Sequence, residues 1–123
     1  MPASRNKQTV ERYLDGFRRT DHAQILECLT DDIVWTVYGH FRLQGKAAYD
    51  EAIEGPGFVG SPELEVVRMV EEGDTVMAEI VGRAPLQDGS WQRMSMAEVF
   101  VLRGGLICER RAWVIALHED DVR

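Results

Sequence analysis

The residue best suited to chemistry is a glutamate inside an apolar run. From Trp91 to Leu102 the residue types favour a β-strand, whose alternation would place on one face Met94, Met96, Glu98, Phe100 and Leu102. Glu98 is the only charged residue in this row. Burial disfavours the charged form of a carboxyl group, which suits a proton donor or a general base near neutral pH. We therefore predict that Glu98 is an acid or base in a pocket, with a structural ion pair as the alternative.

Three other polar residues are candidates. Tyr13 lies on the apolar face of the first predicted helix, where it is either a donor to a ligand or an ordinary core residue. His40 follows a predicted strand, and imidazole titrates in the range useful for acid–base catalysis, although a loop histidine is more often solvated. Arg111 shares a face with Trp113 and Ile115, so it could bind an anionic ligand or neutralise the glutamate.

Aromatic and sulphur-containing residues indicate an apolar pocket. The side chains expected to line it, beside Glu98, are Tyr13, Trp35, Val37, Met94, Met96, Phe100, Arg111, Trp113 and Ile115. Walls of this kind, with few polar groups, suit a hydrophobic small molecule such as a terpenoid, polyketide or steroid-like ring system. The alternative is that these side chains simply fill the core.

Helices come first in the chain and strands follow. Helical periodicity predicts helices over 6–19, from Asp21 as N-cap to about residue 30, and over 46–53, with a strand over 33–38 between the last two. Four β-prone runs come next, over 64–70, 75–83, 91–102 and 106–117, separated by glycine-containing turns. This order indicates an α+β fold in which the helices cover one face of a sheet.

Three short segments in this order resemble the ketosteroid isomerase and SnoaL-like branch of the nuclear transport factor 2-like superfamily. They are Val10-Glu11-Arg12-Tyr13, Asp31-Asp32-Ile33-Val34-Trp35 and Met96-Ala97-Glu98-Val99-Phe100. The resemblance implies a cone: a strongly curved antiparallel or mixed sheet with three N-terminal helices on its concave face. We expect one domain over residues 1–123, with a flexible acidic tail over 118–123.

The resemblance also assigns roles to single residues, but the catalytic base that it implies is missing from this sequence. It places Glu98 where ketosteroid isomerases have a protonated acid that donates to the substrate oxyanion, and Tyr13 at the other half of that oxyanion hole. Val37 stands where the isomerases have their aspartate base, and Ile115 where epoxide hydrolases and polyketide cyclases have an aspartate. The Arg-x-Asp pair of the epoxide hydrolases is also missing, with Ile80 and Gly82 in its place.

Two functions therefore remain open. One is proton transfer of the isomerase, cyclase or epoxide hydrolase type on a hydrophobic substrate, with Glu98 as acid or base. The other is a domain that binds a hydrophobic ligand, or a protein partner as a dimer, without turnover.

Charge and composition exclude other classes of partner. The net charge of −7 repels phosphate backbones and anionic lipid, so neither nucleic acid nor membrane is expected. No stretch approaches the roughly 18 apolar residues that span a bilayer. The two cysteines, Cys28 and Cys108, lie far apart, so we expect free thiols, no metal, no cofactor and a cytoplasmic location.

The second face of the sheet predicts self-association. It is expected to carry Ala97, Val99 and Val101 from one run and Ala112 and Val114 from the next. Apolar residues that no helix covers need another surface, and a homodimer packed sheet against sheet would supply it.

Overall fold

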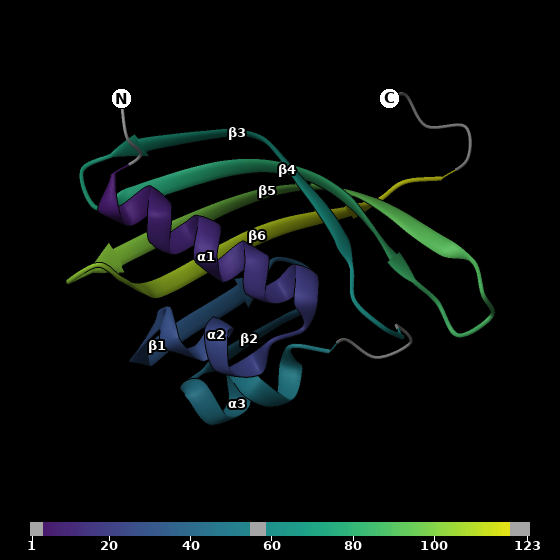
Figure 1. The fold of residues 1–123 in the computed structure, drawn as a ribbon, viewed down its shortest axis with the longest axis horizontal. Coiled ribbons are helices and arrows are strands. Elements are labelled where there is room, and N and C mark those ends of the chain that lie inside the picture. Colours follow the sequence, from purple (N-terminus) through teal and green to yellow (C-terminus); the bar gives the residue numbers. More distant parts are fainter. Residues whose placement is uncertain (1–3, 55–58, 119–123) are drawn as a thin grey trace.

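A six-stranded sheet curves around three helices. The computed structural model describes residues 4–54 and 59–118, so the predicted tail lies, after residue 118, outside the described residues. The elements are α1 (Arg5–Arg19), α2 (His22–Glu27), β1 (Leu29–Val37), β2 (Phe41–Gln44), α3 (Lys46–Ala52), β3 (Glu63–Glu72), β4 (Thr75–Pro85), β5 (Trp91–Arg103) and β6 (Leu106–Ala116). Figure 1 shows α1 lying across the inner side of the sheet, with α2 and α3 below it.

The sheet is mixed. Its strand order is β2-β1-β6-β5-β4-β3. The β1–β6 pair is parallel and the other four pairs are antiparallel. The predicted α+β fold with a curved mixed sheet is confirmed.

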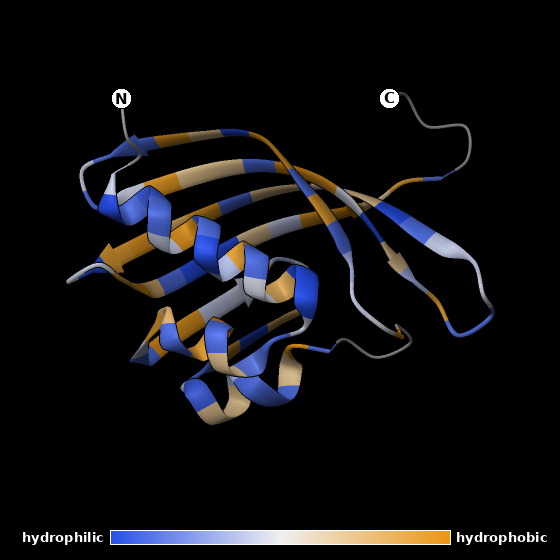
Figure 2. Ribbon diagram, in the orientation of Figure 1, coloured by the Kyte–Doolittle hydropathy of each residue, from blue (hydrophilic) through white to orange (hydrophobic). Residues whose placement is uncertain are grey.

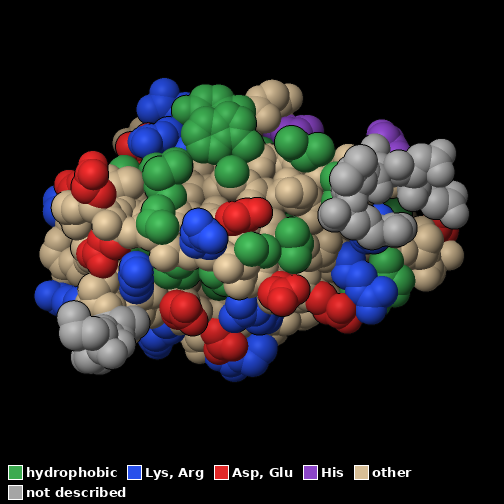
Figure 3. All heavy atoms as spheres, turned by 90° about the horizontal axis from the view of Figure 1, so that it is seen from above, with side chains coloured by type: hydrophobic (Ala, Val, Ile, Leu, Met, Phe, Trp, Pro, Cys, Tyr) green, Lys and Arg blue, Asp and Glu red, His purple; other side chains and the backbone are tan. Residues whose placement is uncertain are grey.

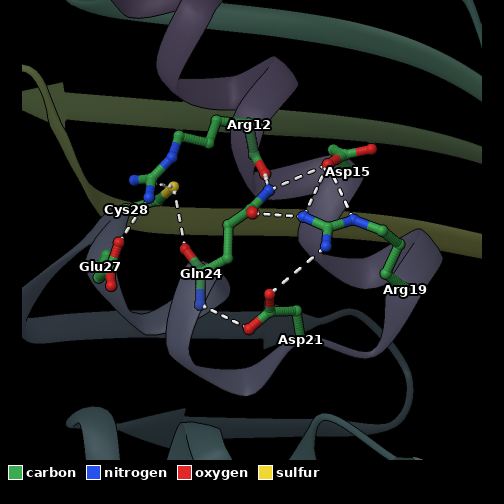
Figure 4. Close-up of polar contacts among 7 residues, drawn as sticks. All are labelled: Arg12, Asp15, Arg19, Asp21, Gln24, Glu27 and Cys28. Atoms are coloured by element: carbon green, nitrogen blue, oxygen red, sulfur yellow. Dashed lines mark hydrogen bonds and ion pairs between the residues drawn. The ribbon is translucent and has the colours of Figure 1, made fainter.

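The first two helices are capped and locked together by their own polar residues. Ser4 accepts a hydrogen bond from Lys7 N at the start of α1, and Asp21 accepts one from Gln24 N at the start of α2, as predicted for Asp21. Figure 4 shows Gln24 reaching back to α1, where its amide donates to Arg12 O at 2.8 Å and to Asp15 Oδ2 at 3.1 Å. These contacts fix α1 over the sheet.

Two predictions about the first strands need correction. β1 begins at Leu29, four residues earlier than predicted, because Leu29 already pairs with Ile107 of β6. Asp32 is tolerated in this strand because its charge stays exposed and pairs with Arg103 at 2.6 Å. The hydrogen bond from Arg103 lowers the pKa of Asp32 to about 2, and Thr30 contributes to the shift. The short edge strand β2 was not predicted; it pairs with β1 through a turn at Gly39, whose φ of 82° favours glycine.

The inner face of β5 carries the side chains that alternation along the strand predicted to lie on one face. Met96, Glu98, Phe100 and Leu102 are buried, and Figure 2 shows hydrophobic and hydrophilic residues alternating along the strands. The register of β6 against β5 then decides which β6 residues point inward: Glu98 lies opposite Ala112, and Ala97 opposite Trp113. Partners directly across a ladder share a face, so Ala112 and Val114 point inward, and the prediction that they lie on the outer face is wrong.

A histidine between two carboxylates joins α2 to α3. His22 Nδ1 lies 2.6 Å from Asp50 Oδ1, and Nε2 lies 2.6 Å from Glu54 Oε1. Hydrogen bonding to Asp50 first, and then to Glu54, raises the pKa of His22 above its ordinary 6.5. Both ring nitrogens can donate only in the protonated form, so the link is complete only while His22 is charged.

We expect this link to stabilise the fold at acidic pH. When folding raises the pKa of a histidine, the histidine stabilises the fold fully at pH values below its ordinary pKa. This stabilisation is lost as the pH rises through the pKa of the folded state. The unfolding temperature of His22→Gln should therefore lie further below that of the wild type at about pH 5.5 than at about pH 8.5. His40→Gln, on the exposed β1–β2 turn, controls for loss of an imidazole; an equal deficit of His22→Gln at both pH values would contradict the prediction.

Candidate functional site

An open cavity of about 1070 Å³ lies between the sheet and the helices. Its inner wall is mainly apolar and includes Leu14, Phe17, Trp35, Val37, Leu64, Met94, Met96 and Val114. His40, Arg42, Glu51 and Glu54 contribute charged or titratable side chains to its lining. A space of this size and character can take a hydrophobic small molecule.

Two charged side chains form part of the cavity wall. Arg110 Nε donates to Glu98 Oε1 at 2.7 Å, and the side chains are 8% and 2% exposed respectively. They come from neighbouring strands, β6 and β5. Removing two charges from water is costly unless they pair, so each of the two charges makes the burial of the other possible.

Two tyrosines hold the far side of the guanidinium. Arg110 Nη1 donates to the Tyr13 hydroxyl at 2.5 Å and to the Tyr49 hydroxyl at 3.3 Å, and the two hydroxyls bond to each other. The cation also lies 4.5 Å from the centre of the Trp35 ring and 5.3 Å from that of Phe17. Helices α1 and α3 and strand β1 thus all contribute to the orientation of one arginine.

The electrostatics keep the tyrosines neutral and the arginine charged. Burial raises the pKa of Tyr13 well above its ordinary value and also raises that of Tyr49. For Arg110, burial acts to lower the pKa, but the negative charge of Glu98 and its hydrogen bond outweigh burial, and the net pKa is raised. Arg110 therefore brings a permanent positive charge to within 2.7 Å of Glu98 Oε1.

The structure separates the predicted residues into three groups. Those that line the cavity are Trp35, Val37, His40, Met94, Met96 and Glu98. Tyr13 and Phe100 are fully buried behind the wall, where their rings pack edge to face at 5.6 Å, so the prediction that they line the cavity is wrong.

The third group is on the other side of the sheet. Trp113 is 43% and Ile115 is 62% exposed, and Arg111 pairs with Glu109 at 3.0 Å. The prediction that these three residues line the cavity is wrong because the β5–β6 register turns them outward. The sequence suggested Arg111 as the residue that neutralises Glu98, but in the structure Arg110 forms this ion pair.

Sequence reasoning missed Arg110 and Tyr49. The Arg110-Arg111 pair showed that one arginine had to face each way, but only the strand register shows which one faces inward. Tyr49 lies in a seven-residue helix, too short for its apolar stripe to be distinctive, and it is fully buried with its ring stacked on Trp35 at 4.6 Å.

The described residues offer no cluster for a metal ion. Among residues 4–54 and 59–118 no three His, Cys, Asp or Glu side chains gather in a metal-binding arrangement. Cys28 and Cys108 are both free thiols, as predicted. No helix in the described part of the chain is long and apolar enough to cross a membrane.

The chain belongs to the SnoaL-like domain family, whose sequence pattern matches residues 10–110. The predicted resemblance is thereby confirmed. No curated protein matches the chain.

Several solved structures are similar in fold. An epoxide hydrolase of the LEH-like type from M. tuberculosis has a TM-score of 0.80 at 21% identity, with 90% of this chain and 83% of that chain covered. A nuclear transport factor 2-like protein from Anabaena variabilis has a TM-score of 0.79 at 21% identity, with coverages of 94% and 93%. SalBIII, an epoxide hydrolase/cyclase-like enzyme of pyran ring formation in salinomycin, has a TM-score of 0.80 at 18% identity, with coverages of 89% and 90%.

Removing one member of the ion pair should destabilise the fold strongly. Arg110→Met leaves the Glu98 carboxylate buried without its partner, which costs about 3–5 kcal/mol in comparable cases. The double variant Arg110→Met/Glu98→Leu removes both charges and should recover much of that loss. The free energy of unfolding in urea measures both effects.

Arg111→Met is the matched control, because this neighbour faces outward and pairs only near the surface. It should change the free energy of unfolding by no more than about 0.5 kcal/mol. Equal losses for Arg110→Met and Arg111→Met would show that the buried pair is not important for the fold.

Proposed function

We propose that this SnoaL-like chain binds a hydrophobic, oxygen-bearing small molecule and transfers a proton on it. Glu98 is the acid or base, and Arg110 stabilises negative charge on the ligand oxygen. The observation that carries the proposal is the buried Glu98–Arg110 pair in the wall of a largely apolar cavity of about 1070 Å³.

The character of the wall supports the ligand class. Aromatic and aliphatic side chains make up most of the cavity surface, and they gain little from a strongly polar ligand. The buried indole N–H of Trp35 has no hydrogen-bond partner among the described residues. The guanidinium of Arg110 in this wall favours a ligand that carries an acceptor oxygen.

The ion pair supports the reaction type. A carboxylate in a poorly hydrated site can accept a proton from a carbon next to a carbonyl and return it to another carbon. The carbonyl oxygen gains negative charge during this step, and a fixed N–H donor beside it lowers the barrier. In this proposal Arg110 takes the place of the tyrosine and protonated acid that the resemblance implied, and Glu98 takes that of the missing aspartate.

The second candidate is ligand binding without turnover. Val37 lies in the cavity wall, where it cannot move a proton, and Ile115 lies outside the cavity altogether. Neither position that carries an aspartate in catalytic relatives therefore supplies one here. This candidate needs the same cavity and differs only in what Glu98 does.

Glu98→Gln separates the two candidates. We expect this variant to keep its affinity for hydrophobic ketones and epoxides within a few-fold, but to lower kcat by about 10²- to 10⁴-fold, because the amide cannot take up a proton. Steady-state turnover with a panel of such compounds, together with quenching of tryptophan fluorescence, measures both properties. Trp35→Phe shows whether the quenching comes from the cavity.

Glu11→Gln is the control for the turnover test, because it makes the same chemical change on the exposed face of α1, outside the cavity lining. It should leave kcat unchanged. Saturable binding without turnover by the wild type would favour the second candidate, and no binding of any compound would overturn both.

We also propose that the chain is a homodimer through the outer face of the sheet. That face exposes Met77, Trp113 and Ile115, and the half-exposed ring of Tyr38 stacks on Trp113 at 4.7 Å. Figure 3 shows hydrophobic side chains set among charged ones on the side of the molecule seen from above. Exposed apolar groups of this size are the usual centre of a protein interface.

The proposed dimer predicts different masses in solution for the wild type and for a variant of its interface. Wild type should sediment at about twice the 14.0 kDa of one chain, and Ile115→Glu should sediment as one chain, because it buries a charge at the interface. Leu106→Glu changes an exposed apolar residue at the β5–β6 turn and should leave the mass of the dimer unchanged. A monomeric wild type would contradict the proposal.

A further inference from the structure

The Glu98–Arg110 contact is made through a single hydrogen bond. A carboxylate and a guanidinium often meet through two parallel bonds, but here only Nε and Oε1 are joined, at 2.7 Å. Glu98 Oε2 and Arg110 Nη2 make no hydrogen bond to the described residues. The pair therefore keeps one acceptor atom and one donor atom for another group.

The Nη1 group of Arg110 is already committed to hydrogen bonds within the protein. Nη1 donates to the hydroxyls of Tyr13 and Tyr49, which lie behind the wall and are fully buried. A ligand in the cavity can therefore meet the guanidinium only through Nη2. Both Glu98 and Arg110 contribute to the cavity lining, where their side chains are 2% and 8% exposed.

We infer that the ligand presents a hydroxyl group to this pair, accepting from Arg110 Nη2 and donating to Glu98 Oε2. The inference rests on the proposed function and adds to it that the hydrophobic ligand carries a hydroxyl group, as alcohols, phenols and enols do.

Other polar groups fit this position less well. A hydroxyl group is one atom that both accepts and donates, so it satisfies both unpaired atoms. An ether oxygen accepts from Nη2 and leaves Oε2 desolvated without a donor. A ligand carboxylate adds a second negative charge beside Glu98, whose charge already neutralises Arg110.

Matched naphthalene compounds test the inference. 2-Naphthol donates and accepts, 2-methoxynaphthalene only accepts, 2-naphthoate is anionic, and naphthalene does neither. Calorimetric titration of the wild type should show 2-naphthol binding at least about tenfold more tightly than each of the other three, because an unsatisfied buried group is costly.

Glu98→Gln should remove the preference for the hydroxyl over the ether. If the amide oxygen keeps the bond to Arg110 Nε, its NH2 group replaces the acceptor with a donor, and 2-naphthol and 2-methoxynaphthalene then bind alike. Glu11→Gln, on the exposed face of α1 and outside the cavity lining, should keep the wild-type preference. A thermal unfolding curve shows whether each variant is folded, and the comparison of ligands on the wild type does not depend on any variant.

The outcomes distinguish this inference from the proposed function. Equal affinity of the wild type for 2-naphthol and 2-methoxynaphthalene would overturn the hydroxyl assignment and leave the hydrophobic pocket intact. Tighter binding of 2-naphthoate would likewise overturn it in favour of an anionic ligand. Failure of all four compounds to bind would overturn the proposed function and the inference together.

Discussion

The rest of the site depends on the ion pair between Arg110 and Glu98. Both side chains are almost completely buried, and each charge is tolerated there only because the other lies 2.7 Å away. Buried pairs add little net stability compared with apolar residues of the same volume. Their position in a cavity wall is therefore better explained by the chemistry of a ligand than by the stability of the fold.

The surrounding aromatic residues restrict the arginine to one orientation. Tyr13 from α1 and Tyr49 from α3 accept its hydrogen bonds on one side, and Trp35 from β1 covers it with an aromatic face. A guanidinium fixed in this way loses little further freedom when a ligand binds. The helices that cover the sheet thus also prepare the polar part of the cavity.

Fold similarity and site chemistry lead to different conclusions in this family. The chain shares its architecture with an epoxide hydrolase and a cyclase-like enzyme at TM-scores of 0.80. At 21% and 18% identity this likeness establishes the fold alone. The resemblance places Val37 and Ile115 where catalytic relatives have aspartates, so the chemistry proposed for this chain uses a different set of residues, the Glu98–Arg110 pair of the cavity wall.

The sequence by itself determined the order of the three helices and the five longer strands, the fold class and the inward position of Glu98. Those conclusions follow from local patterns: helical periodicity in α1, alternation in β5, and glycine turns between the long strands. Only the tertiary structure decided which arginine enters the cavity, because alternation leaves the two faces of β6 equivalent until its register with β5 is set. It also decided that Tyr13 supports Arg110 from behind the wall, since this depends on contacts between residues 97 positions apart, which no local pattern encodes.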